Sequence, residues 1–175
     1  PDSLRYVTPD QADAAALSPR QREVLEEINR KVAGRESVEQ IIDYLFDATV
    51  DISPADRVSV AFVAEQGERI VSYYTRAAYE PVLLKRGYAE DLRFSSLDEV
   101  IRRGAVRIIG DLEAYLAAHP DSRSTKLLVA EGVRSSMTCP LAVEGRNVGV
   151  LFRSSRHADA YGREEVAAHL GVAER

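Results

Sequence analysis

The sequence predicts an α+β domain built on an antiparallel β-sheet, and three features indicate this. Two segments rich in β-branched residues, 57–76 and 133–153, each read as two strands joined by a short turn, "EQG" and "EGR", which is typical of antiparallel hairpins. Helices with clear start signals are predicted around both hairpins. A chain of 175 residues can form one domain with a core and is too short for two of ordinary size. We expect residues 18–175 to form this domain and residues 1–17 to form a linker or a partly ordered extension.

Two amphipathic helices are predicted before the first hairpin, over residues 18–34 and 37–50. Each begins with a capping box, Ser18 with Gln21 and Ser37 with Gln40. The second helix has a wide apolar face and is expected to lie flat on the sheet. The first has a narrow apolar stripe that can pack either on the domain or on a helix of a partner: Leu17, Val24, Leu25, Ile28 and Val32.

The segment between the hairpins is predicted to contain several short helices. Residues 77–94 show no clean periodicity, whereas Ser96 and Glu99 predict a capping box for a helix that ends at Gly104. A brief strand, "AVRIIGD", follows, and Asp111 is predicted to cap the next short helix. Further helices are expected over residues 122–131 and 162–175.

Composition and charge exclude several classes of function. The net charge of −5 argues against a nucleic-acid surface, which is normally basic. No apolar run reaches the roughly 18 residues of a membrane span, so no membrane contact is expected. The single cysteine cannot form an internal disulfide, which favours a reducing, cytoplasmic compartment. Because the chain begins at Pro1 without an initiator Met, we interpret it as a piece of a longer protein.

Four segments together resemble the GAF sensor domain in both residues and order. They are "DRVSVAFVAEQGERI", "SSLDEVIRRGAVRIIGDL", "VRSSMTCPLAVEGRNVGVLFRSS" and "DAYGREEVAAHL", and they span residues 56–170. The resemblance implies a PAS-related central antiparallel sheet with the N- and C-terminal helices on one face. It also implies that residues 77–135 form a lid of loops and short helices on the other face.

The same resemblance implies a regulatory or sensory role in a bacterial signal-transduction protein. The output domain expected first is a sensor histidine kinase, and a diguanylate cyclase or cyclic-di-GMP phosphodiesterase comes next. Members of the family bind cyclic nucleotides, tetrapyrroles, haem, small anions or amino-acid-like metabolites, and some bind nothing, so the resemblance names no cofactor. A homodimer through the terminal helices is expected.

Differences between this sequence and known subtypes of the family narrow the range of ligands that we expect. The stretch "RSSRHADAYGREE" lacks the Asn-Lys of cyclic-nucleotide-binding members. Cys139 lies on a predicted strand and not in the lid, so a covalently attached bilin is not expected. Among the three histidines, only His119 lies in the predicted lid, where it could ligate haem axially.

Seven residues are the candidate ligand-binding set because they lie at strand ends or in the predicted lid. An arginine among them could hold a carboxylate or phosphate bidentately. The alternative is that the tyrosines pack in the core and that the arginines are solvated or paired with Asp91 or Asp111. The candidates are Tyr74, Arg76, Arg93, Phe94, Asp111, Arg134 and Ser136.

No catalytic motif was found, and we expect this segment not to be an enzyme on its own. Cys139 can be read as a nucleophile, which needs an exposed, electropositive setting, or as a small buried hydrophobe. A further alternative is a ligand-free dimerisation module whose pocket is filled by its own bulky side chains: Tyr79, Leu83, Leu84, Tyr88 and Leu92.

Overall fold

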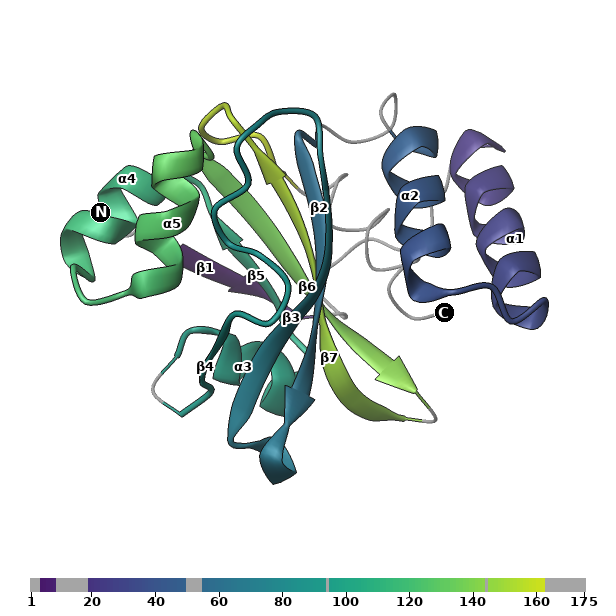
Figure 1. Cartoon of the computed structure of the whole chain (residues 1–175), viewed down its shortest axis with the longest axis horizontal. Coiled ribbons are helices and arrows are strands. Elements are labelled where there is room, and N and C mark those ends of the chain that lie inside the picture. Colours follow the sequence, from purple (N-terminus) through teal and green to yellow (C-terminus); the bar gives the residue numbers. More distant parts are fainter. Residues whose placement is uncertain (1–3, 9–18, 50–54, 94, 144, 163–175) are drawn as a thin grey trace.

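The computed structural model describes residues 4–8, 19–49, 55–93, 95–143 and 145–162. These residues form one seven-stranded sheet in the order β1-β5-β6-β7-β2-β3-β4. Every neighbouring pair of strands is antiparallel. The predicted α+β fold is thereby confirmed (Figure 1).

Both predicted hairpins are present, as β2 with β3 and β6 with β7. The first strand, β1, lies in the segment expected to be a linker or partly ordered extension, and it pairs with β5 at the edge of the sheet. The strands are β1 (Leu4–Val7), β2 (Arg57–Ala64), β3 (Arg69–Ala77), β4 (Ala89–Asp91), β5 (Val106–Ile109), β6 (Ser135–Val143) and β7 (Arg146–Ser155).

The helices cover the two faces of the sheet unequally. Helices α1 and α2 lie together on one face, and α3, α4 and α5 lie on the other side (Figure 1). Ser18 and all but the first residue of the helix expected over 162–175 lie outside the described residues. The helices are α1 (Pro19–Ala33), α2 (Val38–Ala48), α3 (Leu97–Arg103), α4 (Leu112–Ala118) and α5 (Arg123–Glu131), with a short 3₁₀ turn, η2 (Glu65–Gly67).

One of the predicted capping boxes is confirmed and another is wrong. Ser37 Oγ accepts the Gln40 amide at 3.1 Å, and Gln40 Oε1 accepts the Ser37 amide at 2.9 Å. Ser96 makes no side-chain cap bond to α3. Its hydroxyl instead accepts a hydrogen bond from Arg107 Nη1 at 2.8 Å. A tertiary partner has therefore taken the oxygen that the local pattern assigned to the helix.

The main core lies between the sheet and the helix pair α1–α2. Alternate strand residues point into it, among them Val60, Met137 and Cys139, which are all buried. Val24 and Ile28 of α1 are buried in the same cluster, so the apolar stripe of α1 packs within this chain. Val32, at the end of the stripe, is 45% exposed.

The opposite face of the sheet carries polar side chains in its middle. Arg57, Ser59, Arg107, Thr138 and Ser154 are all buried there, and the strand register places Arg57 beside Ser154 and Arg107 beside Thr138. Buried polar groups need partners, because their removal from water is costly. The polar side chains on this face therefore need hydrogen-bond partners, which neighbouring strands, the lid or a ligand can supply.

Gly149 permits the close approach of β7 to β2, which gives a first test of the fold. A Cβ at this position would lie 2.3 Å from the Ala61 carbonyl oxygen and 3.2 Å from Phe62 Cα. Because both are backbone atoms, Gly149→Ala should lower the free energy of unfolding by about 1–3 kcal/mol in urea titrations. Gly34→Ala, where the contacts are looser, serves as control and should change it by less than about 1 kcal/mol. Equal effects would contradict the close approach.

Candidate functional site

The carboxylate of Glu131, the last residue of α5, fastens the lid to the sheet. Its side chain has no exposed surface. It accepts the backbone amides of Leu83 and Leu84, each at 2.8 Å, and the Tyr79 hydroxyl. Arg57 Nε of β2 completes the set at 3.2 Å. One buried anion therefore joins a helix, a strand and the loop between β3 and β4.

Arg57 continues this network across the sheet. Its guanidinium donates to Ser59 Oγ at 2.8 Å and to the Leu84 carbonyl at 3.0 Å. The Leu84 backbone is thus held at both its amide and its carbonyl. A buried ion pair is stable only when its remaining donors and acceptors are satisfied. Here they are satisfied by Ser59, by Tyr79 and by the backbone of Leu83 and Leu84 in the loop between β3 and β4, which we call the lid loop.

Tyr79 acts as a hydrogen-bond donor to this network throughout the ordinary pH range. Burial and the hydrogen bond to the Glu131 carboxylate raise the pKa of the Tyr79 phenol far above its usual value. The Arg156 guanidinium also lies over the Tyr79 ring, 5.1 Å from its centroid. These contacts keep the start of the lid loop against the end of α5.

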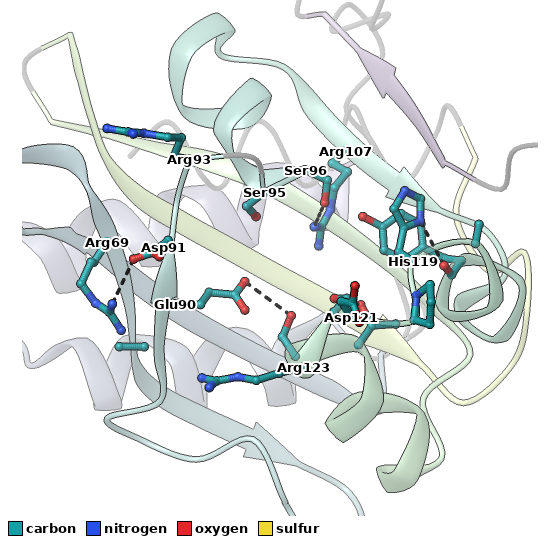
Figure 2. A pocket seen from close by; sticks show the side chains of 17 residues that line it. Arg69, Glu90, Asp91, Arg93, Ser95, Ser96, Arg107, His119, Asp121 and Arg123 are labelled. Atoms are coloured by element: carbon teal, nitrogen blue, oxygen red, sulfur yellow. Dashed lines mark hydrogen bonds and ion pairs between the residues drawn. The ribbon is translucent and has the colours of Figure 1, made fainter.

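A pocket of about 620 Å³ opens beside this fastened part of the lid. It lies between β4, the segment before α3, the strand β5 and the connection from α4 to α5 (Figure 2). Its volume is in the range of small-molecule sites. Charged and hydroxyl side chains dominate its wall: Arg69, Glu90, Asp91, Arg93, Ser95, Ser96, Arg107, Asp121, Ser122, Arg123, Ser124 and Thr125.

A narrower chamber of about 60 Å³ lies deeper, between the lid and the polar face of the sheet. Arg57, Ser59 and Ser154 form part of its floor, and Leu84 and Tyr88 of the lid loop form part of its roof. The chamber and the outer pocket share four lining residues, so they adjoin: Glu90, Arg107, Ser124 and Thr125.

Arg107 lines both spaces and so stands at their junction. Figure 2 shows its side chain in the outer pocket. Its side chain donates to Ser96 Oγ at 2.8 Å and to Thr138 Oγ1 at 3.0 Å. Nε has no hydrogen-bond partner in the described part of the chain. Burial lowers the pKa of the Arg107 guanidinium, but an arginine remains charged in proteins.

Two of the predicted ligand-binding residues lie on the opposite face of the sheet. The Tyr74 hydroxyl donates to Asp43 Oδ1 at 2.9 Å, and Arg76 pairs with Asp43 and Asp47, both at 3.2 Å. Both acidic partners belong to α2. Tyr74 and Arg76 therefore join the sheet to the helix pair, and the structure does not bring them to the pocket.

The other predicted residues are divided between structural contacts and the pocket. Asp111 caps α4 by accepting the Ala114 amide at 3.1 Å. Arg134 pairs with Glu113 at 3.0 Å and donates to the carbonyl oxygens of Val129 and Val133. Ser136 is buried, and its hydroxyl has no partner within the described ranges. Arg93 lines the outer pocket, and Phe94 lies outside the described residues.

Arg107 and Glu90 line both spaces, and neither is among the residues that the sequence suggested. Strand alternation could have found Arg107, because "AVRII" places one arginine in an otherwise apolar strand, on the face opposite to Val106 and Ile108. Glu90 carried no such signal. It lies in the three-residue strand β4, which forms only by pairing with β3.

The candidate haem ligand, His119, is exposed at the end of α4. Its ring stacks on Tyr115 with centroids 4.2 Å apart, and Nδ1 lies 3.1 Å from the Tyr115 carbonyl oxygen. Within the described ranges, no group of three or more His, Cys, Asp or Glu side chains is placed to hold a metal ion. None of the helices in those ranges has the length and apolar character to cross a bilayer.

Fold and pocket together define a class of protein: an α+β domain that encloses a polar pocket between an antiparallel sheet and a lid of short helices. The family model for the GAF domain matches residues 35–173, which is most of the chain. The chain therefore belongs to the GAF domain family.

Several solved structures have the same fold at low sequence identity. The phycoerythrobilin-bound GAF domain of a cyanobacterial phytochrome is 18% identical with a TM-score of 0.64, covering 90% of this chain and 95% of that one. The GAF domain of a two-component sensor histidine kinase from Bacillus halodurans is 15% identical with a TM-score of 0.64, covering 79% and 89%. The free methionine-R-sulfoxide reductase from Neisseria meningitidis, solved with its substrate, is 19% identical with a TM-score of 0.61, covering 90% of each. No curated protein matches the chain significantly in sequence.

Replacing the Glu131 carboxylate tests whether it fastens the lid. Glu131→Gln should lower the free energy of unfolding by about 3–5 kcal/mol, because it leaves the Arg57 charge buried without its anion. The backbone amides of Leu83 and Leu84 should also exchange with solvent faster than in the wild type. Both effects can be measured by urea titration and by hydrogen exchange.

Glu113→Gln is the matched control. It also removes a carboxylate from an arginine pair, here with Arg134, but the Glu113 side chain is 62% exposed. It should change stability by less than about 1 kcal/mol. A stable Glu131→Gln variant with unchanged lid exchange would contradict the role given to Glu131.

Proposed function

We propose that this domain is the sensory or regulatory part of a bacterial signal-transduction protein and that it binds a small molecule in the pocket under its lid. The observation that carries the proposal is the pocket of about 620 Å³ lined by charged and hydroxyl side chains. The fold shared with the GAF domain of a sensor histidine kinase supports such a kinase as the output domain. A cyclic-di-GMP cyclase or phosphodiesterase is the alternative output.

A ligand-free dimerisation module is the competing proposal, and the lid gives it some support. Leu84 and Tyr88 do reduce the inner chamber to about 60 Å³, and Leu92 is buried. The outer pocket is nevertheless wide and polar, and a module that fills its own cavity has no need of it. The sensor is therefore the function that the geometry favours.

A homodimer through the terminal helices remains part of the proposal. The stripe on α1 packs within the chain, so such a dimer would use the charged outer face of α1, where Glu27 pairs with Arg30 and Lys31, or residues beyond those described. We also propose that the segment is not itself an enzyme and that it works in the cytoplasm. Its single cysteine is buried in the core.

Binding in the pocket can be tested with a panel of probes and a variant that blocks it. Nucleotides, haemin, biliverdin, amino acids, carboxylates and phosphate would be screened by thermal shift and native mass spectrometry. At least one should raise the melting temperature of the wild type in a concentration-dependent way. Ser124→Phe, at the junction of pocket and chamber, should abolish that shift.

Ala130→Phe is the control, because Ala130 is an exposed residue of the same helix and does not line either space. This variant should retain the shift. Binding in this pocket would be contradicted if no probe raised the melting temperature of the wild type, or if a probe raised it equally in Ser124→Phe.

The proposal that the segment is not an enzyme predicts an unreactive thiol. Cys139 is fully buried in the main core, so a thiol reagent can reach it only after the core opens. Its reaction with 5,5′-dithiobis(2-nitrobenzoic acid) should be at least about a hundred-fold slower in the native protein than in urea. Equal rates would instead favour a cysteine enzyme on the same fold.

A further inference from the structure

We propose that Arg107 is the anion-recognition residue of the pocket and that the ligand carries a carboxylate or phosphate group bound by its guanidinium. This inference rests on the proposed function, because it names the ligand class of the same site. Arg107 was not among the residues that the sequence suggested, and its assignment comes from its contacts.

Arg107 buries a positive charge without a counterion among the described residues. The residue is only 7% exposed, and no carboxylate oxygen of the described residues lies within the 4.0 Å that defines an ion pair. Buried charges are normally paired, because an uncompensated charge away from water is costly. An anion in the pocket would supply the missing charge.

Arg57 provides the comparison within the same molecule. It lies on the same face of the sheet, is 2% exposed, and pairs with the Glu131 carboxylate at 3.2 Å. Two buried arginines therefore face the lid, and the lid supplies an acidic partner to only one of them among the described residues. The other, Arg107, faces the open part of the site.

The hydrogen-bonding groups around Arg107 also favour an anionic ligand. Its protein partners are the hydroxyl oxygens of Ser96 and Thr138, which are neutral acceptors. Arg107 Nε is buried and has no hydrogen-bond partner in the described part of the chain. Oxygen atoms of a carboxylate or phosphate would be charged acceptors, which form the stronger bonds with a guanidinium.

The shape of the site leaves room for a ligand beside the Arg107 guanidinium. Arg107 lines both the chamber of about 60 Å³ and the pocket of about 620 Å³. The anionic group would lie at the junction and the rest of the ligand in the outer pocket, toward which Glu90 points from β4 (Figure 2). Glu90 receives bonds from the Tyr88 hydroxyl at 3.1 Å and the Ser124 hydroxyl at 3.4 Å, so each of its carboxylate oxygens has a hydroxyl partner of its own.

Matched pairs of probes separate charge from shape. Benzoate would be compared with benzamide, and phenyl phosphate with phenol, by isothermal titration of the wild-type domain in Tris chloride at constant ionic strength. At least one anion should bind about ten- to a hundred-fold more tightly than its neutral counterpart, which is the range of charge-assisted hydrogen bonds. The ratio of anion affinity to neutral-probe affinity is then compared between the two pairs. A larger ratio for benzoate indicates a carboxylate ligand, and a larger ratio for phenyl phosphate indicates a phosphate ligand.

Three variants test the assignment to Arg107. Arg107→Met should remove the preference for the anion and leave the melting temperature of the ligand-free domain equal or higher, because it removes an unpaired buried charge. Arg107→Lys keeps the charge without the planar fork, so it should keep part of the preference. Arg102→Gln removes a charge from the exposed surface of α3 and should bind like the wild type.

The outcomes separate this inference from the proposed function. If neutral probes bind as well as the anions and Ser124→Phe blocks them, the ligand class is wrong and the pocket function stands. If no probe of any class binds, both fall. If Arg107→Met unfolds the domain, the Arg107→Lys variant decides the question together with Thr138→Val, which removes a hydroxyl partner of Arg107. The assignment to Arg107 would be overturned if Arg107→Lys kept the full anion preference of the wild type and Thr138→Val kept its full anion affinity.

Discussion

The lid side of this domain depends on the buried carboxylate of Glu131. Taking a carboxylate out of water costs several kcal/mol, and this cost is offset only when Arg57, Tyr79 and the amides of Leu83 and Leu84 are all in place. The loop after β3, the end of α5 and the strand β2 are therefore positioned together. Gly132, in the left-handed conformation at φ 99°, ends α5 at this point and directs the chain toward β6.

This constraint explains why the pocket lies where it does. The Glu131 network closes the half of the lid that covers Arg57, and the other half, above Arg107, remains lined by hydroxyl and charged side chains. A ligand there would contact β4, β5 and the connection from α4 to α5 without disturbing the fastened half. The α1–α2 pair, joined to the sheet by Tyr74 and Arg76, lies on the opposite face. In the proposed sensory role, a signal would pass through the sheet from the pocket face to the face covered by α1 and α2.

The sequence predicted the elements better than the site. Alternation and the "EQG" and "EGR" turns predicted both hairpins, because these signals are local. The edge strands β1 and β4 were missed, since each is short and forms by pairing with a distant or neighbouring strand. Tyr74 and Arg76 became candidates because they lie near the end of the second strand. In the structure their side chains contact α2, and no local pattern shows the register shift between Val60 and Ala61 that interrupts the alternation there. The pairing of Arg57 with Glu131 joins residues 74 positions apart, and no local pattern indicates it.

Arginine side-chain NMR tests most directly the claim that an anion binds at Arg107. The Nε–H signal of Arg107 can be assigned as the one lost in Arg107→Lys, and benzoate and phenyl phosphate can then be titrated into the labelled domain. The account predicts a saturable shift of the Arg107 signal with at least one of the two anions and little change in the Arg57 signal, because Arg57 already has its carboxylate. A shift confined to exposed arginines, with the Arg107 signal unchanged, would contradict it.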